Sequence, residues 1–216
     1  MKTWLVLLPL LAAPLWAAEV RLFNGKDLSG WARIPRHEEG TAGEKPGFLV
    51  RDGLLVSIPD APEDDLWYTR EKIGNTTLRV VYKVSAPVAN SGVFIRIPDQ
   101  PKSEDDAINK GIEVQIQDTG DEYHCTGVLY SMTQAKARPY RPAGDWNTLE
   151  ITMRGQRTTV RLNGELVTDY DGVAAVPPKR GQYEPDRGAR PDTGYIAIQH
   201  HGGAETVWFK EITLIR

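Results

Sequence analysis

GIEVQIQD, residues 111–118, alternates apolar and polar side chains without a break. Successive side chains of a β-strand point to opposite faces, so the three apolar residues face one way and Glu113, Gln115 and Gln117 face the other. Glu and Gln are poor strand formers, and solvated strand faces more often carry Thr, Lys and Arg. The stretch therefore predicts a strand with one face in a core and a polar row with a separate purpose on the other.

Two more segments repeat this pattern. In GVFIRI, residues 92–97, the three β-branched residues form an apolar face, which leaves Arg96 and an aromatic ring opposite. In YIAIQHH, residues 195–201, two isoleucines face the core while Gln199 and His201 point away. If the three strands are neighbours in one sheet, they line a single groove with Arg96, Glu113, Gln115, Gln199 and His201.

The rest of the chain repeats short alternating segments between turn residues, and no stretch after the N-terminal segment keeps a 3.6-residue apolar period for three turns. Strands are expected at residues 54–58, 78–84, 92–97, 111–117, 148–153, 158–162, 194–199 and 207–214. Asn163-Gly164 predicts a type I′ hairpin, because both residues adopt positive φ readily, and Asp52-Gly53 is a weaker signal of this kind. Loops 98–110 and 171–193 are unusually long, which is typical of functional lids or of mobile surface segments. The chain is predicted to be all-β.

Length and composition limit the organisation of the chain. About 200 residues of β-structure normally form one sandwich domain with one core, here residues 19–216. Cys125 is the only cysteine, so an intramolecular disulfide is impossible and stability must come from burial. The formal net charge of -3 is too small to indicate nucleic acid or a strongly anionic surface as the partner.

The N-terminus, residues 1–18, is predicted to be an export signal. Lys2 forms a short basic region, an apolar run follows it, and Ala17 and Ala18 are small residues near the expected cleavage site. The apolar run is interrupted by prolines and is shorter than the roughly 20 residues of a spanning helix. We therefore expect cleavage, no stable membrane insertion afterwards, and a periplasmic or extracellular protein.

The predicted groove suits a polyhydroxyl ligand. Planar amides, a carboxylate and a guanidinium form bidentate hydrogen bonds to hydroxyl groups, and a sugar ring needs an apolar platform, for which Tyr130 and Trp146 are candidates. The alternation turns His200 toward the core, where a structural role is expected. His37 and His124 show no metal-ligand spacing and are assigned no role.

Several segments resemble one known family. They are LFNGKDLSGW at residues 22–31, NSGVFIR at 90–96, EVQIQD at 113–118, TGVLY at 126–130, DWN at 145–147, LNG at 162–164 and IQHHG at 198–202. Together and in this order they are similar to the 3-keto-disaccharide hydrolase family, which has 3-keto-glucoside 1,2-lyase and 3-keto-2-hydroxy-glucal hydratase activities. The resemblance implies a concanavalin A-like jelly roll of two antiparallel sheets, exported by bacteria that degrade glycans after oxidising a sugar at C3.

The implied reaction begins with loss of the C2 proton, which the neighbouring 3-keto group acidifies. It needs a base with a pKa near the working pH and a strong donor at O3, and we expect His201 as base or proton shuttle and Arg96 as the donor. Glu113 is expected to orient sugar hydroxyls or the imidazole. Substrate contacts are assigned to Gln115, Gln199, Tyr130, Trp146 and Asp118. No cofactor is certain, and a divalent metal ion bound by Glu113 and His201 could assist or replace Arg96.

Two other functions remain open at the level of the sequence. A non-catalytic carbohydrate-binding module would use the same polar row only to bind sugar, since the fold serves both roles. A conventional retaining glycosidase is the third reading, because the Glu113 segment faintly resembles the catalytic row of sandwich-fold glucanases. Retention needs two carboxyl groups about 5 to 5.5 Å apart. Glu113 and Asp118 are an odd number of residues apart and are expected on opposite faces.

Overall fold

The computed structural model describes residues 18–34 and 45–216. The predicted export signal and His37 lie outside the described residues, apart from Ala18. Within them the chain forms thirteen strands and one short π-helical turn, η1 (Asp106–Lys110). The strands are β1 (Glu19–Arg21), β2 (Trp31–Arg33), β3 (Phe48–Arg51), β4 (Leu54–Ser57), β5 (Leu66–Tyr68), β6 (Thr77–Val84), β7 (Ser91–Ile97), β8 (Ile112–Ile116), β9 (Asn147–Arg154), β10 (Arg157–Leu162), β11 (Glu165–Tyr170), β12 (Tyr195–Ile198) and β13 (Val207–Ile215).

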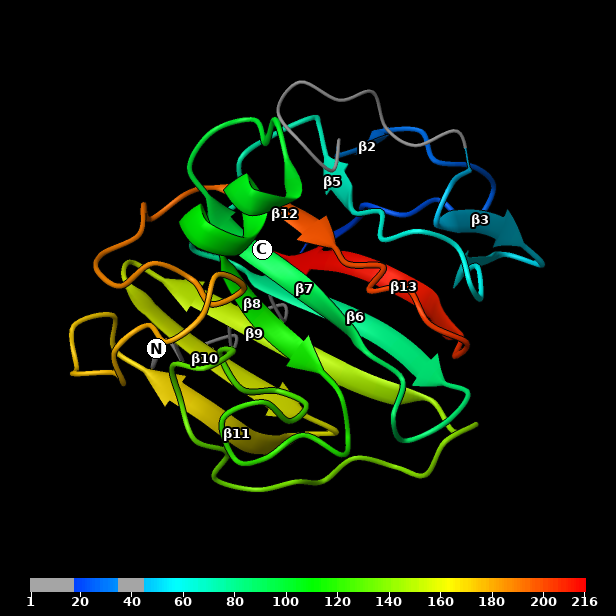
Figure 1. The fold of residues 1–216 in the computed structure, drawn as a ribbon. Coiled ribbons are helices and arrows are strands. Elements are labelled where there is room, and N and C mark those ends of the chain that lie inside the picture. The colour runs from blue at the N-terminus through cyan, green and yellow to red at the C-terminus, as the bar shows by residue number, and fades with distance from the viewer. Residues whose placement is uncertain (1–17, 35–44) are drawn as a thin grey trace, which may run out of the picture.

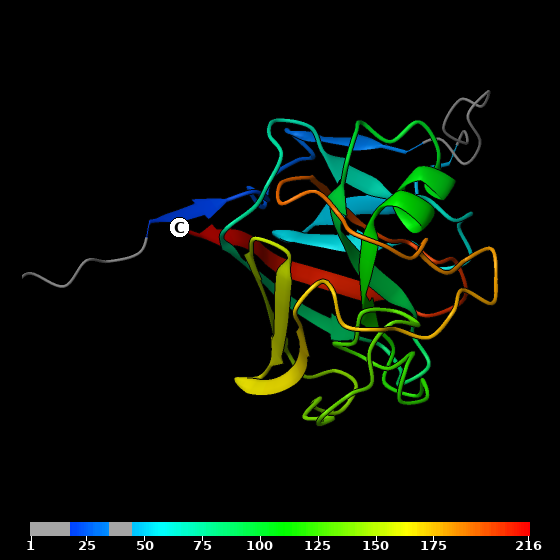
Figure 2. The ribbon, with the colours of Figure 1, turned by 90° about the vertical axis from the view of Figure 1, so that its left-hand side faces the viewer.

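The strands form two antiparallel sheets that pack face to face (Figures 1 and 2). The larger sheet has the order β11-β10-β9-β6-β13-β4-β3, and β1 adds to β13 beside the chain's C-terminus. The smaller sheet has the order β2-β5-β12-β7-β8. The predicted fold class is confirmed: the protein is an all-β, concanavalin A-like jelly-roll sandwich.

All eight predicted strands are present, with ends shifted by one residue or not at all. Asn163 and Gly164 have φ values of 51° and 86° between the paired residues Leu162 and Glu165, as a type I′ hairpin requires. Asp52 and Gly53 form a second tight turn, also with positive φ at both residues. The sequence did not reveal β1, β2, β3, β5 and β11. The first four have only three or four residues, which are too few for alternation to stand out.

The core lies between the sheets. Alternate residues of β6, β9 and β13 face alternate residues of β7, β8 and β12, and the buried apolar side chains form one cluster. A second, smaller cluster covers the other face of the smaller sheet, where Phe94, Ala197 and Trp67 pack with Ala107 of η1. The smaller sheet is thus buried on both faces, and polar side chains on its outer face are shielded from water.

A β-bulge in β7 changes one prediction. Phe94 pairs with Ala197 and Ile97 with Tyr195, so Ile95 and Arg96 together oppose a single residue of β12. Arg96 has a φ of 59° at this bulge, and its alternation with Phe94 is broken. Ile97, expected on the core face beside Ile95, packs instead in the outer cluster with Phe94.

The two long loops meet on the outer side of the smaller sheet. The first contains η1, and the 171–194 segment lies beside it in both ribbon views (Figures 1 and 2). The Asp186 amide donates to Asn109 O at 2.9 Å, which ties the two loops together. These loops therefore form the walls above the sheet.

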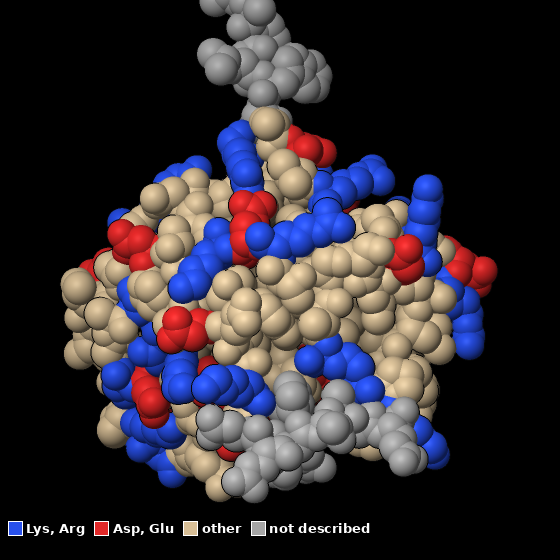
Figure 3. All heavy atoms as spheres, turned by 90° about the horizontal axis from the view of Figure 1, so that it is seen from above, with Lys and Arg blue, Asp and Glu red and all other residues tan. Residues whose placement is uncertain are grey.

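The surface carries charges of both signs. Figure 3 shows Lys and Arg interspersed with Asp and Glu on the face seen there. Arg79, for example, pairs with both Glu19 and Glu211. Among the described residues, none of the helical segments has the length and apolar character needed to cross a membrane.

Candidate functional site

The candidate site is built on two rows of side chains that run across the smaller sheet. The first row aligns Trp67, Ala197, Phe94 and Glu113 on four neighbouring strands. The next row on the same face follows from the same register and holds Asp65, Gln199, Gly92 and Gln115. The apolar first row ends in a carboxyl group, and the second row is polar throughout except for its glycine.

Gly92 makes room for the Glu113 carboxyl. A Cβ atom built on Gly92 would overlap Oε1 of Glu113 and come within 2.8 Å of its Cγ and Cδ. Glu113 therefore bends over the one position of the second row that has no side chain. This arrangement brings its carboxyl beside Gln115 at the base of a cavity.

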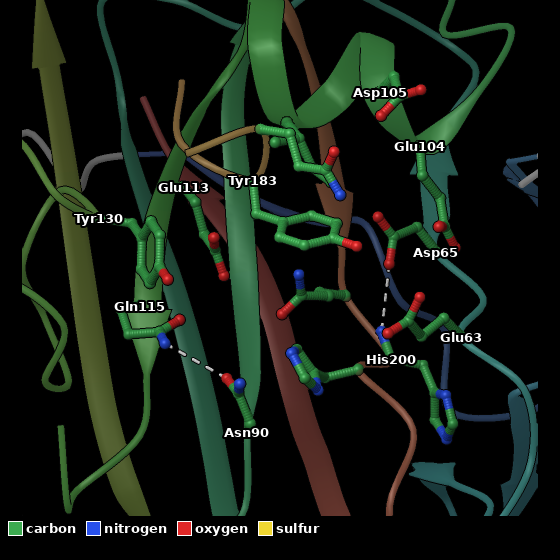
Figure 4. A pocket seen from close by; sticks show the side chains of 14 residues that line it. Glu63, Asp65, Asn90, Glu104, Asp105, Glu113, Gln115, Tyr130, Tyr183 and His200 are labelled. Carbon is green, nitrogen blue, oxygen red and sulfur yellow. Dashed lines mark hydrogen bonds between the residues drawn. The ribbon is translucent and has the colours of Figure 1, made fainter. Parts of the chain in front are cut away.

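The cavity has a volume of about 450 Å³ and opens above these rows (Figure 4). Its floor comes from β8, the end of β12 and the start of β5, and its walls come from the two long loops. The lining residues are Glu63, Asp65, Asn90, Glu104, Asp105, Ile108, Glu113, Gln115, Tyr130, Gln182, Tyr183, Gln199, His200 and His201.

Two carboxyl groups of the floor are shielded from water. Glu113 is 6% exposed, and burial raises its pKa to about 8. Asp65 is 2% exposed, and burial, followed by the charges of Glu104 and Glu113, raises its pKa well above the ordinary value. Transfer of a carboxylate from water to a low-dielectric site disfavours the charged form. At neutral pH Glu113 is therefore held mainly as the neutral acid, and burial disfavours the charged form of Asp65 in the same way.

Amide groups complete the floor. In the orientation drawn in Figure 4, Gln115 Nε2 donates to Asn90 Oδ1 at 3.2 Å. Turned by 180°, the same amide donates to Glu113 Oε1 at 2.9 Å and to Ser91 O at 3.0 Å, which satisfies more acceptors. Gln199 Oε1 is buried and has no hydrogen-bond partner among the described residues. A ligand hydroxyl can supply that partner.

The two adjacent histidines have different environments. His200 is buried, its Nδ1 accepts a hydrogen bond from the Gly202 amide, and its Nε2 lies 3.0 Å from Ile58 O. Nε2 must therefore carry the proton of a neutral ring. Its ring packs edge-on against Phe48, while His200 also lines the cavity, and its structural role stays a prediction. His201 is exposed and lines the cavity.

The structure brings together five of the predicted site residues. Glu113 and Gln115 lie on the floor, Gln199 and His201 follow β12, and Tyr130 lines the cavity near Glu113. The Tyr130 amide donates to Glu113 O at 2.9 Å, which ties its loop to β8. The expectation that these strands are neighbours is therefore confirmed for β7, β8 and β12.

Arg96 does not line the cavity, contrary to the prediction. The bulge directs its side chain to the edge of the larger sheet, where it is 1% exposed. Its guanidinium donates to Gly155 O at 2.7 Å, Pro191 O at 3.0 Å and Arg157 O at 3.1 Å. Arg96 joins the two sheets and a loop, and it cannot contact a ligand in the cavity.

Asp118 and Trp146 also lie outside the cavity. Asp118 has the opposite parity to Glu113 and is buried, where it accepts a hydrogen bond from Thr126 Oγ1 at 2.7 Å. Trp146 precedes β9 in the larger sheet, and its ring contacts Lys83 and Lys210 at 5.0 and 5.6 Å. Both residues were assigned to the site because they lie close in sequence to polar strands. Closeness in sequence does not specify which sheet a residue joins or which face it occupies.

Asp65 and Tyr183 line the cavity but were not among the predicted site residues. Asp65 directly precedes β5, whose three residues were too few to be recognised, although the parity it shares with Trp67 points it to the cavity. Tyr183 belongs to the long 171–194 loop, where no periodicity predicts direction. The acidic side chains Glu63, Glu104 and Asp105 reach the cavity from loops in the same way.

The residues do not fit the divalent cation that the sequence left open. In residues 18–34 and 45–216, no three His, Cys, Asp or Glu side chains are arranged to hold a metal ion. Other carboxyl groups line the same cavity as Glu113 and His201, but they are not arranged with these two side chains to hold a metal ion.

Comparison with known proteins supports this description of the fold. Two crystal structures named "putative glycosyl hydrolase", both from Parabacteroides distasonis, are similar to the chain. One is 24% identical with a TM-score of 0.68 over 91% of this chain and 98% of its own. The other is 21% identical with a TM-score of 0.70 over 91% and 93%. An endo-beta-1,3(4)-glucanase shares the fold at 10% identity, with a TM-score of 0.57 over 95% and 93%.

A search of curated proteins found no match. A family model, in contrast, matches residues 18–215, nearly the whole chain, and it describes the 3-keto-alpha-glucoside-1,2-lyase-like domain. The motifs and the two-sheet fold agree with this match. The chain belongs to the 3-keto-alpha-glucoside-1,2-lyase-like domain family.

Proposed function

We propose that the protein is an exported enzyme that cleaves 3-keto-glycosides by elimination across C1 and C2, followed by hydration. The observation that carries this proposal is the Glu113 carboxyl, buried at the floor of a polar cavity with a pKa of about 8. Family membership indicates a glycoside-acting enzyme. The N-terminal pattern of residues 1–18 supports export.

The proposed reaction uses the acidity of the carbon next to a ketone. A base removes the C2 proton, and the C2–H electrons form an enolate with its negative charge on O3. The enolate then expels the glycosidic oxygen from C1, which restores the C3 ketone and leaves a C1–C2 double bond. Addition of water, with hydroxyl to C1 and a proton to C2, completes a net hydrolysis.

Glu113 is the proposed base. A general base is most effective when its pKa lies near the working pH, and a pKa of about 8 meets that condition where an ordinary carboxylate does not. After elimination the protonated Glu113 can return its proton to C2 during hydration. His201, at the exposed side of the cavity, is proposed to exchange protons between the leaving oxygen and solvent.

Asp65 is the proposed donor at O3, in place of Arg96. Burial raises the pKa of this carboxyl well above its ordinary value, which favours the protonated form, and a protonated carboxyl can donate a hydrogen bond to the developing enolate. One oxygen, Oδ1, accepts a hydrogen bond from the His200 amide at 3.2 Å, which holds the carboxyl at the floor of the cavity. Preorganised donors at a developing negative charge typically contribute a factor of about 10² to 10³ in kcat.

The test is to incubate the protein with a 3-keto-disaccharide and with its unoxidised parent in D2O, while NMR follows sugar release and loss of the C2 proton signal. We expect cleavage of the oxidised sugar only. Glu113→Gln should abolish both cleavage and enzyme-dependent C2 exchange, while Glu165→Gln, an exposed carboxylate on β11, serves as the matched control.

Other outcomes would contradict this proposal. Binding of glycans without cleavage of either sugar would make the protein a carbohydrate-binding module. Cleavage of the unoxidised parent would indicate a conventional glycosidase. If Glu113→Gln still exchanges the C2 proton at the wild-type rate, Glu113 is not the base.

A further inference from the structure

Tyr183 is a large side chain that is exposed beside the cavity. It is 64% exposed, and of the large hydrophobic side chains that the structure shows exposed, it is the one that lines the cavity. Figure 4 shows its ring extending into the cavity, with the hydroxyl directed to the side that carries Asp65. An aromatic ring left in water at the mouth of a polar cavity is suited to contact a ligand.

A tight turn presents this ring. The Glu184 amide donates to Gly181 O at 3.3 Å, so Gln182 and Tyr183 form the tip of the turn, and both line the cavity. The Arg180 amide donates to Glu184 Oε2 at 2.9 Å and closes the turn from the other side.

Arg187 fixes the turn to its surroundings. Its guanidinium donates to Glu184 Oε2 at 2.9 Å, to Pro177 O at 2.7 Å and to Ser131 Oγ at 3.1 Å. The side chains of the Arg187–Glu184 pair are 19% and 15% exposed, so the pair is largely shielded from solvent. A turn held in this way loses little conformational entropy when a ligand binds.

The cavity has a buried end and an open end. Glu113 and Asp65, the groups proposed to react with the 3-keto ring, are almost completely buried, whereas Tyr183 and His201 lie at the exposed side. A glycoside whose keto ring occupies the buried end must extend its leaving group toward the exposed end. The leaving group then reaches the ring of Tyr183.

We propose that Tyr183 is a specificity-determining residue that forms the platform for the leaving group. The preferred substrates are therefore 3-keto-glycosides whose leaving group is itself a ring, as in a 3-keto-disaccharide, rather than a small alkyl alcohol. This inference rests on the proposed function, since it assumes that the keto ring lies over Glu113.

The test compares two substrates with the same reacting ring, a 3-keto-alpha-glucosyl disaccharide and the methyl 3-keto-alpha-glucoside. In Tyr183→Ala we expect the ratio of kcat/KM for the disaccharide to that for the methyl glycoside to fall about tenfold, mainly through KM. That fold-change corresponds to about 1.4 kcal/mol of lost contact. Tyr183→Phe keeps the ring and should keep the ratio. Tyr140→Ala, which removes an exposed tyrosine outside the cavity, is the matched control.

Arg187→Gln provides an independent test, because it loosens the turn without touching the ring. It should lower the same ratio by several fold. An unchanged ratio in Tyr183→Ala, or an equal fall for both substrates, would overturn the proposal while leaving the proposed function intact. If the unaltered protein cleaves neither substrate, the proposed function fails and this inference fails with it.

Discussion

Replacing Glu113 by Gln should stabilise the protein at high pH, by an amount that follows from the burial of the carboxyl. In the folded chain the pKa of Glu113 is about 8, against an ordinary value of 4.5. A group whose pKa is raised on folding favours the folded state fully below its unfolded pKa, and this advantage is lost as the pH rises through the folded pKa. Gln cannot ionise, so the Glu113→Gln variant keeps this stabilisation of the folded state at high pH.

The magnitude follows from about 1.4 kcal/mol for each pKa unit. In the unfolded wild type the Glu113 carboxyl has its ordinary pKa, about 2.5 units below pH 7, so its ionisation favours unfolding at that pH. The unfolding free energy of the variant should therefore exceed that of the wild type by about 3 kcal/mol at pH 7. At pH 9 nearly the whole shift counts, and the gain approaches about 5 kcal/mol. This is a large fraction of the 5–15 kcal/mol that typically stabilises a domain. Loss of the Glu113 charge also relieves Asp65, which acts in the same direction.

The assay is equilibrium urea unfolding of both proteins at pH 5, 7 and 9 and constant ionic strength. We expect the difference in unfolding free energy to grow with pH, with equal m-values. Glu165→Gln, on the exposed side of β11, should show a difference that hardly changes with pH. A difference for Glu113→Gln that is constant from pH 5 to 9 would refute the view that Glu113 is a buried, largely neutral acid.

Three further predictions concern the carboxyl groups of the cavity, the glycine beside Glu113, and Arg96. The kcat/KM for a 3-keto-glycoside should rise with pH toward about 8 as Glu113 ionises, and a flat profile across this range would contradict its role as base. Any fall in kcat/KM at higher pH that reports loss of the Asp65 proton should be absent in Asp65→Asn. Gly92→Ala should lower kcat/KM about 100-fold or more, because the new Cβ displaces the Glu113 carboxyl. The far-UV circular dichroism spectrum should not change. A rate near that of the wild type would mean that the carboxyl can move without loss of function. Arg96→Met should lower the free energy of unfolding in urea by about 3 kcal/mol or more, because it leaves three partly buried carbonyl groups without a hydrogen bond. The kcat per folded molecule should change little. A variant that is stable but inactive would indicate that Arg96 acts in the site after all.

Local patterns in the chain were sufficient to predict eight of the thirteen strands in the described part of the chain and two of its tight turns. The alternation in residues 111–118 identifies β8 and its two faces, because side-chain direction in a strand depends only on the residue's position. Asn163-Gly164 identifies its hairpin, because positive φ is a property of those residue types. This basis assigned Glu113, Gln115, Gln199 and His201 to one groove only on the condition that their strands are neighbours, and the order of the sheet supplies that condition.

Tertiary contacts decided the rest of the site. A bulge, which depends on pairing between β7 and β12, turns Arg96 away from the cavity, and the order of the sheets places Trp146 on the larger one. Asp65 and Tyr183 enter the cavity through segments whose direction no periodicity encodes. The pKa of Glu113 depends on burial by loops distant in sequence, because desolvation is a property of the assembled environment. The residues able to do the chemistry can be recognised in the chain, but their protonation states and neighbours exist only once it is folded.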